Sequence, residues 1–155
     1  MGFRSLVTLI RLLALPGVVG LVASCAGTQM ATIISGNSDQ CLNFPIEGNP
    51  VIGTPARIHA CDPFKNQQWN VAKGEISASG NICLTVPDDA VDGTPVVFAS
   101  CRGAPGQHWS EQENGHIVGI GGKCLDVEGG SAVQWAPVII STCSDAPTQK
   151  WNVQR

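Results

Sequence analysis

The chain has 155 residues, enough for one domain with a hydrophobic core of its own. Only 14% of the residues are charged and 5% are aromatic, while there are 18 glycines and 10 prolines. This composition favours short strands joined by tight turns, and therefore an all-β fold. Because the formal net charge is −3 and basic residues do not cluster with aromatic ones, we do not expect the chain to bind nucleic acid.

The N-terminus has the outline of an export signal. Arg4 and Arg11 accompany an apolar stretch over residues 12–23, which is too short and too weakly flanked to be a stable membrane span. The sequence LVASC at residues 21–25 resembles the lipobox of bacterial lipoproteins, in which the cysteine is acylated and becomes the new N-terminus. We therefore predict a signal peptide over residues 1–24, lipidation of Cys25, and a tether over residues 25–31.

The alternative is an ordinary secretory signal in which Cys25 is incidental. In both cases the mature protein is exported. It is then either lipid-anchored to the bacterial cell membrane, its membrane contact being the lipid on Cys25, or secreted. Disulfide bonds persist in such compartments.

One sequence outline occurs three times, at residues 41–69, 83–109 and 124–151. Each copy has Cys-Leu, a loop rich in Gly and Pro, a short apolar run, a second cysteine and then Gln-x-Trp. In every copy the second cysteine precedes the tryptophan by eight positions, as from Cys61 to Trp69. A fixed repeat of this length indicates repeated structural units. We predict one domain over residues 32–155, with repeats over about 32–73, 74–112 and 113–155.

Six of the 7 cysteines occupy equivalent places in the repeats, and the seventh, Cys25, lies outside them. The repeat makes one pairing natural, with a disulfide inside each copy: Cys41 with Cys61, Cys83 with Cys101, and Cys124 with Cys143. Each would stabilise the fold by roughly 3 kcal/mol. Three reduced, buried pairs are the alternative. We expect no metal site, because Cys-x-x-Cys pairs and clustered histidines do not accompany these cysteines.

Each repeat is predicted to contain four short strands separated by turns such as Gly53-Thr54-Pro55. The expected strands are 32–35, 42–44, 56–60 and 68–71 in the first repeat, 75–78, 84–86, 96–100 and 108–111 in the second, and 116–120, 125–127, 138–142 and 150–153 in the third. Twelve strands would leave too many edges in an open sheet, so closure into a barrel is expected.

Equivalent apolar positions in the repeats predict a three-fold core. They are Leu42, Leu84 and Leu125; Ile58, Phe98 and Ile140; and Trp69, Trp109 and Trp151. We interpret the tryptophans as core residues rather than as ligand platforms. Their companions Gln67, Gln107 and Gln149 are expected to satisfy backbone groups where the strands bend.

These three copies resemble the ricin B-type lectin domain, a β-trefoil that also serves as a carbohydrate-binding module of bacterial glycosidases. The resemblance implies one shallow sugar site per copy. An acidic residue two after the first cysteine would orient the sugar hydroxyls. An aromatic residue two before the second cysteine would stack on the ring, and an Asn before Gln-x-Trp, often with a Gln four before the second cysteine, would complete the site.

This chain departs from that pattern in every copy. The third copy has the acid, Asp126, but Ser141, Ile139 and Thr148 replace the other groups. Trp135, in the loop between Asp126 and Ser141, is expected to supply a stacking surface, with packing on the barrel rim as the alternative; a turn-stabilising role is the alternative for Asp126.

The first copy has Asn43 in place of the acid, Arg57 in place of the Gln, His59 in place of the aromatic residue, and the expected Asn66. The second copy has Thr85, Val97, Ala99 and Gly106 at these positions and is predicted to be purely structural.

The sequence does not favour an enzyme, because its three histidines lack a nucleophile or acid at suggestive spacing, and it implies no cofactor. We expect a lectin-like lipoprotein that binds a glycan or polysaccharide through weak, partly degenerate sites, chiefly in the third copy. The alternative is a trefoil that does not bind sugar and that presents its loops to a protein, as inhibitor trefoils do.

Overall fold

The computed structural model describes residues 29–45 and 51–155. The predicted signal peptide and the lipidation site Cys25 lie outside the described residues. Within them, no helix is both long enough and apolar enough to cross a membrane.

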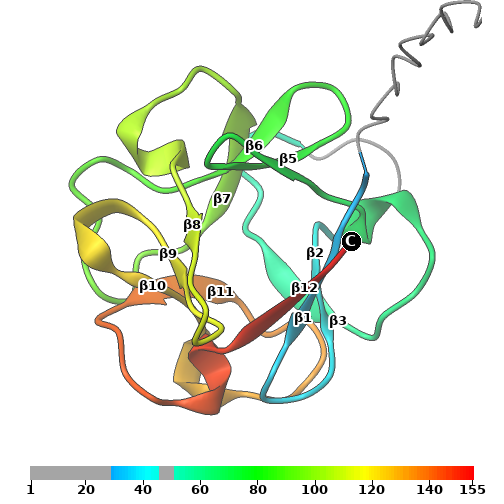
Figure 1. Ribbon diagram of the computed structural model, residues 1–155, viewed down its shortest axis with the longest axis vertical. Helices are drawn as coiled ribbons and strands as arrows, with labels where there is room; N and C mark the ends of the chain where they lie inside the picture. Colours follow the sequence, from blue (N-terminus) through cyan, green and yellow to red (C-terminus); the bar gives the residue numbers. More distant parts are fainter. Residues whose placement is uncertain (1–28, 46–50) are drawn as a thin grey trace, which may run out of the picture.

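The described residues form an all-β fold with short 3₁₀ helices, and Figure 1 shows its three sheets arranged around the centre of the molecule. The strands are β1 (Thr32–Ser35), β2 (Cys41–Asn43), β3 (Arg57–His59), β4 (Asn70–Ala72), β5 (Glu75–Ala78), β6 (Ile82–Thr85), β7 (Val97–Ser100), β8 (Ser110–Glu111), β9 (Ile117–Val118), β10 (Cys124–Val127), β11 (Val138–Ser141) and β12 (Trp151–Gln154). The 3₁₀ helices are η1 (Lys65–Gln67), η2 (Pro105–Gln107), η3 (Ile120–Gly122), η4 (Glu128–Gly130) and η5 (Pro147–Gln149).

The expected strands are present, and several of them are shorter than the sequence predicts. The strand expected at 68–71 begins only at Asn70, because residues 65–67 form η1 and Trp69 makes an isolated bridge to Ala31. The strand expected at 116–120 ends at Val118, where Gly119 leads into η3 and Gly121 adopts a left-handed φ of 64°. Both 3₁₀ helices are closed by local backbone hydrogen bonds, from the N–H of Gln68 to the carbonyl of Lys65 and from the N–H of Lys123 to the carbonyl of Ile120.

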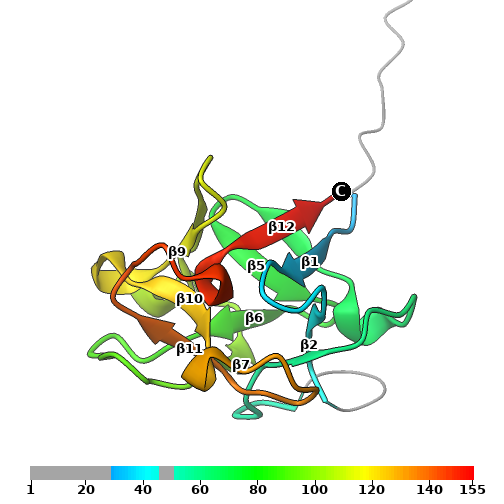
Figure 2. The same cartoon turned by 90° about the horizontal axis from the view of Figure 1, so that it is seen from below.

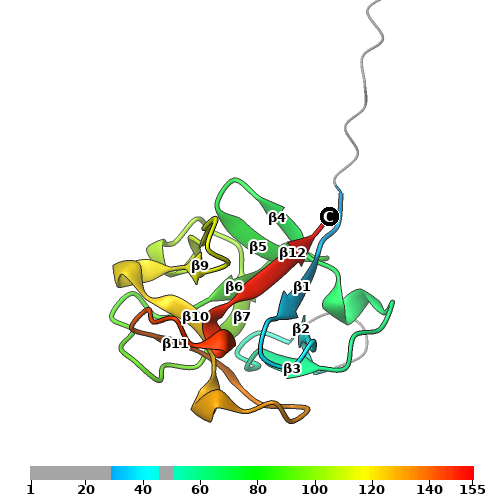
Figure 3. The same cartoon turned by 60° about the horizontal axis from the view of Figure 1, so that its bottom comes forward.

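Each sheet combines the last strand of one repeat with the first three strands of the next. The antiparallel orders are β12-β1-β2-β3, β4-β5-β6-β7 and β8-β9-β10-β11. The repeats therefore interlock. The pairing of β12 with β1, from Thr32 opposite Gln154 to Ser35 opposite Trp151, places the two ends of the domain side by side (Figures 2 and 3).

A ring of backbone hydrogen bonds joins the three long hairpins. The N–H of Ala56 donates to the carbonyl of Val96 at 2.8 Å, the N–H of Val96 to Val138 at 3.0 Å, and the N–H of Val138 back to Ala56 at 3.0 Å. Because the ring is closed, the loop of each repeat is fixed against a strand of a neighbouring one. This contact places a loop of the third repeat over β3 of the first.

The core has the predicted three-fold composition. The nine equivalent Leu, Ile, Phe and Trp side chains are all buried, with exposures between 0% and 5%. Each tryptophan donates its indole N–H to the carbonyl of the equivalent leucine: Trp69 to Leu42 at 3.1 Å, Trp109 to Leu84 at 2.9 Å and Trp151 to Leu125 at 2.9 Å. These bonds give the one polar atom of each ring a partner inside the core.

The predicted disulfides are confirmed. Cys41 is bonded to Cys61, Cys83 to Cys101 and Cys124 to Cys143, with Cα–Cα distances of 5.0 Å in all three. Each bond closes a loop within one repeat and ties its first hairpin strand to the turn after its second.

Candidate functional site

The hairpin β2–β3 carries three polar side chains on one face. Asn43 lies opposite Arg57, and Cys41 lies opposite His59. Because side chains alternate across a strand, Asn43, Arg57 and His59 share a face while the intervening Ile58 enters the core. The 3₁₀ helix η1 brings Asn66 to this face, where its Nδ2 donates to Oδ1 of Asn43 at 2.8 Å.

Two amide atoms in this group have no partner among the described residues. They are Nδ2 of Asn43, a donor, and Oδ1 of Asn66, an acceptor, and both are buried. Leaving such a group unpaired costs about 1–3 kcal/mol, so each is a place where an additional partner would be stabilising. A sugar hydroxyl both donates and accepts, so it offers the two kinds of partner that these atoms lack.

The structure places Trp135 against the first repeat. Its ring lies 4.3 Å from that of His59, centroid to centroid, at an interplanar angle of 41°. Its backbone N–H donates to the carbonyl of Ile58 at 2.8 Å, and its carbonyl accepts from Nη1 of Arg57 at 2.6 Å. Two residues expected in different sites, His59 and Trp135, therefore form one aromatic surface where the first and third repeats meet.

Trp135 has an unusual backbone conformation. Its φ is +70°, and the residues that make the equivalent hydrogen bond in the other two loops are glycines, Gly53 and Gly93, both with φ of +85°. A bulky side chain at positive φ is strained, and such strain is found at functional sites. Trp135 is 43% exposed, so this strained position presents part of an aromatic side chain to solvent.

In the third repeat, Asp126 lies opposite Ile139 on the hairpin β10–β11. Its Oδ2 accepts a hydrogen bond from Nε2 of Gln149 at 2.9 Å. Its Oδ1 is buried and has no partner among the described residues. Ser141 stands where the first repeat has His59, so this face has a carboxylate but lacks its own aromatic residue.

The second repeat is filled by backbone. A Cβ on Gly106 would lie 1.9 Å from the carbonyl oxygen of Val86, so η2 packs directly on the end of β6 and leaves no room for a side chain there. Thr85 is occupied internally: its hydroxyl donates to the Cys83 carbonyl at 2.9 Å and accepts from Gln107 at 3.1 Å.

The three glutamines hold equivalent turns. In each, Nε2 donates to a carbonyl at the end of the hairpin, and Oε1 accepts from a backbone N–H just after the second cysteine. The carbonyls that accept from Nε2 belong to Ala60 (from Gln67), Ser100 (from Gln107) and Thr142 (from Gln149). The N–H groups that donate to Oε1 belong to Asp62, Arg102 and Ser144 in the same order, and all six distances lie between 2.7 and 3.1 Å. These contacts make the glutamines part of the scaffold.

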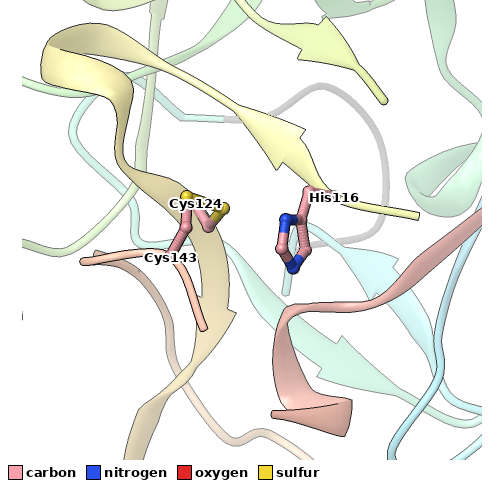
Figure 4. A group of neighbouring side chains, drawn as sticks. All are labelled: His116, Cys124 and Cys143. Carbon is pink, nitrogen blue, oxygen red and sulfur yellow. A yellow bond between two sulfur atoms is a disulfide. The ribbon is translucent and has the colours of Figure 1, made fainter. Parts of the chain in front are cut away.

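A histidine lies beside one disulfide, as Figure 4 shows for His116, Cys124 and Cys143. Both sulfur atoms are bonded to each other, so neither is available as a thiolate ligand for a metal. Nε2 of His116 lies 2.9 Å from the Ser144 carbonyl and 3.0 Å from Nζ of Lys150. We therefore assign this cluster to the packing of the third repeat.

Sequence reasoning missed the contact of Trp135 with His59 and the hydrogen bond from Arg57 to the carbonyl of Trp135. A signal for the first was present, because Trp-Ala-Pro at 135–137 occurs where the other repeats have Gly-Thr-Pro. The loop of the third repeat therefore differs from the other two in having a tryptophan where they have a glycine with left-handed φ.

Comparisons with known proteins agree with this geometry. The family model for the ricin-type β-trefoil lectin domain matches residues 29–151. A search of curated proteins found no match. Among solved structures, the designed three-fold symmetric protein ThreeFoil has a TM-score of 0.74 at 24% identity, over 81% of this chain and 98% of that one.

Two natural proteins are similar in fold. The C-half of an earthworm R-type lectin, solved in complex with GalNAc, has a TM-score of 0.68 at 16% identity, over 81% of this chain and 98% of its own. An exo-β-1,3-galactanase from Clostridium thermocellum has a TM-score of 0.72 at 20% identity, over 83% of this chain but only 30% of its own. The match over residues 29–151 shows that the chain belongs to the ricin-type β-trefoil lectin domain family.

Proposed function

We propose that this protein is a carbohydrate-binding protein of the bacterial cell envelope, anchored by a lipid on Cys25, and that it binds sugar through its first repeat. Membership of a lectin domain family supports carbohydrate as the ligand class. The LVASC sequence at residues 21–25 supports the anchor.

The observation that carries the choice of repeat is the face of β2–β3. There a buried, unpaired amide donor on Asn43 and a buried, unpaired amide acceptor on Asn66 lie on the face that also carries the partly exposed His59–Trp135 surface. A pyranose offers both kinds of group, since its hydroxyls need hydrogen-bond partners and its C–H face needs a flat apolar surface. The second repeat has neither group, and Asp126 in the third already shares one oxygen with Gln149.

A shallow site of this kind binds weakly. An affinity in the millimolar range corresponds to roughly −4 kcal/mol, because sugar hydroxyls gain little over water when they bind protein. Many anchored copies that meet a repetitive polymer would raise the overall affinity through effective concentration, without any new contact.

The test is binding of the full-length chain, purified in a detergent that carries no sugar, to a broad glycan array. His59→Ala should abolish retention, while the matched control Ser141→Ala, at the equivalent position of the third repeat, should leave it unchanged. If Ser141→Ala abolishes binding and His59→Ala does not, the third repeat is the site. A blank array with the parent chain would refute carbohydrate binding.

One observation favours protein binding as the second candidate. The three long loops carry exposed aliphatic side chains at equivalent places, Val51, Val91 and Val133, with exposures of 53%, 66% and 67%. Exposed apolar groups of this kind are common in protein interfaces. If the array is blank, capture of a partner that is lost on Val→Asp substitution at these loops would support this candidate.

A further inference from the structure

We infer that the first repeat selects an anionic saccharide, one that carries a carboxylate as a uronic acid does, and that Arg57 is the residue that binds this carboxylate. The inference rests on the proposed function, because it assigns the substrate class of the same site.

The first repeat differs from the other two in the charge of its hairpin face. Arg57 stands where the second and third repeats have Val97 and Ile139, and Asn43 stands where they have Thr85 and Asp126. The third repeat thus has a carboxylate without a cation, and the first has a cation without a carboxylate. The sign of the site is reversed between two repeats of the same fold.

Arg57 is held in place while most of its donors stay open. Its Nη1 donates to the carbonyl of Trp135 at 2.6 Å. Among the described residues, this is the one hydrogen bond that the Arg57 guanidinium makes. A guanidinium has five N–H donors in a rigid fork that matches a carboxylate. The fork is therefore oriented by the third repeat and retains donors for a ligand.

The nearest acidic side chain along the chain does not neutralise Arg57. Oδ1 of Asp62 accepts a hydrogen bond from the backbone N–H of Phe64 at 2.9 Å, and none of the ion pairs among the described residues includes Arg57. The whole chain has a net charge of −3, so it does not attract anions without a local site. An anion is therefore expected to bind only where a local positive charge such as that of Arg57 is present.

The neighbouring groups fit the rest of such a sugar. His59 shares the hairpin face with Arg57 and lies two residues along the strand, and its ring contacts that of Trp135 at a tilt of 41°. Nδ1 of His59 lies 3.2 Å from the carbonyl of Ala60. Carboxylate recognition by Arg57 and ring stacking on the aromatic pair can thus act on one saccharide.

The experiment uses paired tetramers of galacturonate, glucuronate and mannuronate, each compared with the same tetramer whose carboxylates are reduced to primary alcohols. The full-length chain should bind at least one acid tetramer about tenfold more tightly than its reduced partner at low salt, and high salt should shrink the difference. Arg57→Gln should bind both members of the pair equally.

Arg102→Gln is the matched control, since it removes the same charge from an exposed position in the second repeat. It should behave as the parent does. Circular dichroism checks the fold of each variant. Arg57→Lys keeps the charge and should retain an acid preference; loss of all preference in Arg57→Lys would contradict the inference.

The inference would also be overturned by equal affinity of the parent for acid and reduced tetramers, by an unchanged acid preference in Arg57→Gln, or by equal losses in Arg57→Gln and Arg102→Gln. In each of these cases neutral glycans could still bind on the array, and the proposed function would stand. Failure of every acid tetramer to bind would also overturn the inference, and only a blank array would remove the proposed function with it.

Discussion

Replacement of Trp135 by glycine should be less destabilising than replacement by alanine, which is the reverse of the usual order. Both variants lose the ring and its contact with His59, so they differ only in the backbone. A residue with a Cβ at left-handed φ costs about 1–2 kcal/mol relative to glycine. Alanine gains roughly 0.4–1 kcal/mol because it restricts the unfolded chain. At φ of +70° the first effect is larger, and Trp135→Gly should be the more stable variant by roughly 0.5–1 kcal/mol.

The equivalent loops show that the difference comes from the backbone and not from crowding. A Cβ built on Gly53 or Gly93 meets nothing within 4 Å. The assay is equilibrium urea unfolding of the full-length chain, followed by far-UV circular dichroism. Val133 in the same loop is the control site, because it is 67% exposed and is not among the residues with positive φ. There the alanine variant should be the more stable one.

If Trp135→Ala is as stable as Trp135→Gly, or more stable, residue 135 is not held in the left-handed conformation. The position of its ring on His59 and of its carbonyl on Arg57 depends on that conformation. The geometry of the candidate site would then be wrong.

Three further predictions test other parts of the account. Cys25→Ala should leave an unprocessed or soluble precursor with an unchanged fold, seen as a shift on gels and loss from the membrane fraction; normal processing would exclude the lipobox. Trp151→Ala should cost about 3–5 kcal/mol or unfold the domain, as measured by urea denaturation, because its side chain is only 5% exposed. The pKa of Asp92 is lowered from 3.8 by hydrogen bonds from Lys123 and then Thr142, so its contribution to stability is present above pH 3.8 and is lost as the pH falls through the lowered pKa. Asp92→Asn should therefore lower the melting temperature near neutral pH and have little effect in strong acid; an equal effect at both would contradict this cause.

The sequence predicted the fold because the repeat itself carries the information. Equivalent leucines, tryptophans and cysteines in three copies determine a three-fold core and the disulfide pairing. The composition of the sheets was not predictable in the same way. Since β12 pairs with β1, each sheet crosses the boundary of a repeat, and this depends on how the three repeats close around the core.

The candidate site was only partly predictable for a similar reason. The positions of Asn43, His59 and Asn66 follow from the repeat. The contact between His59 and Trp135 joins residues of the first and third repeats, and it arises from the closed ring of loops. A sequence pattern within one repeat cannot contain that contact.

The most direct test of carbohydrate binding at the first repeat is titration of the isotope-labelled, full-length chain with the saccharide that the array identifies, followed by NMR. The side-chain amide signals of Asn43 and Asn66, the ring signals of His59 and the indole N–H of Trp135 should shift together and saturate at one affinity. Signals of Thr85 and Ser141, at equivalent positions in the other repeats, should remain in place. Shifts confined to Asp126 and Ser141, with those four side chains unchanged, would contradict the account.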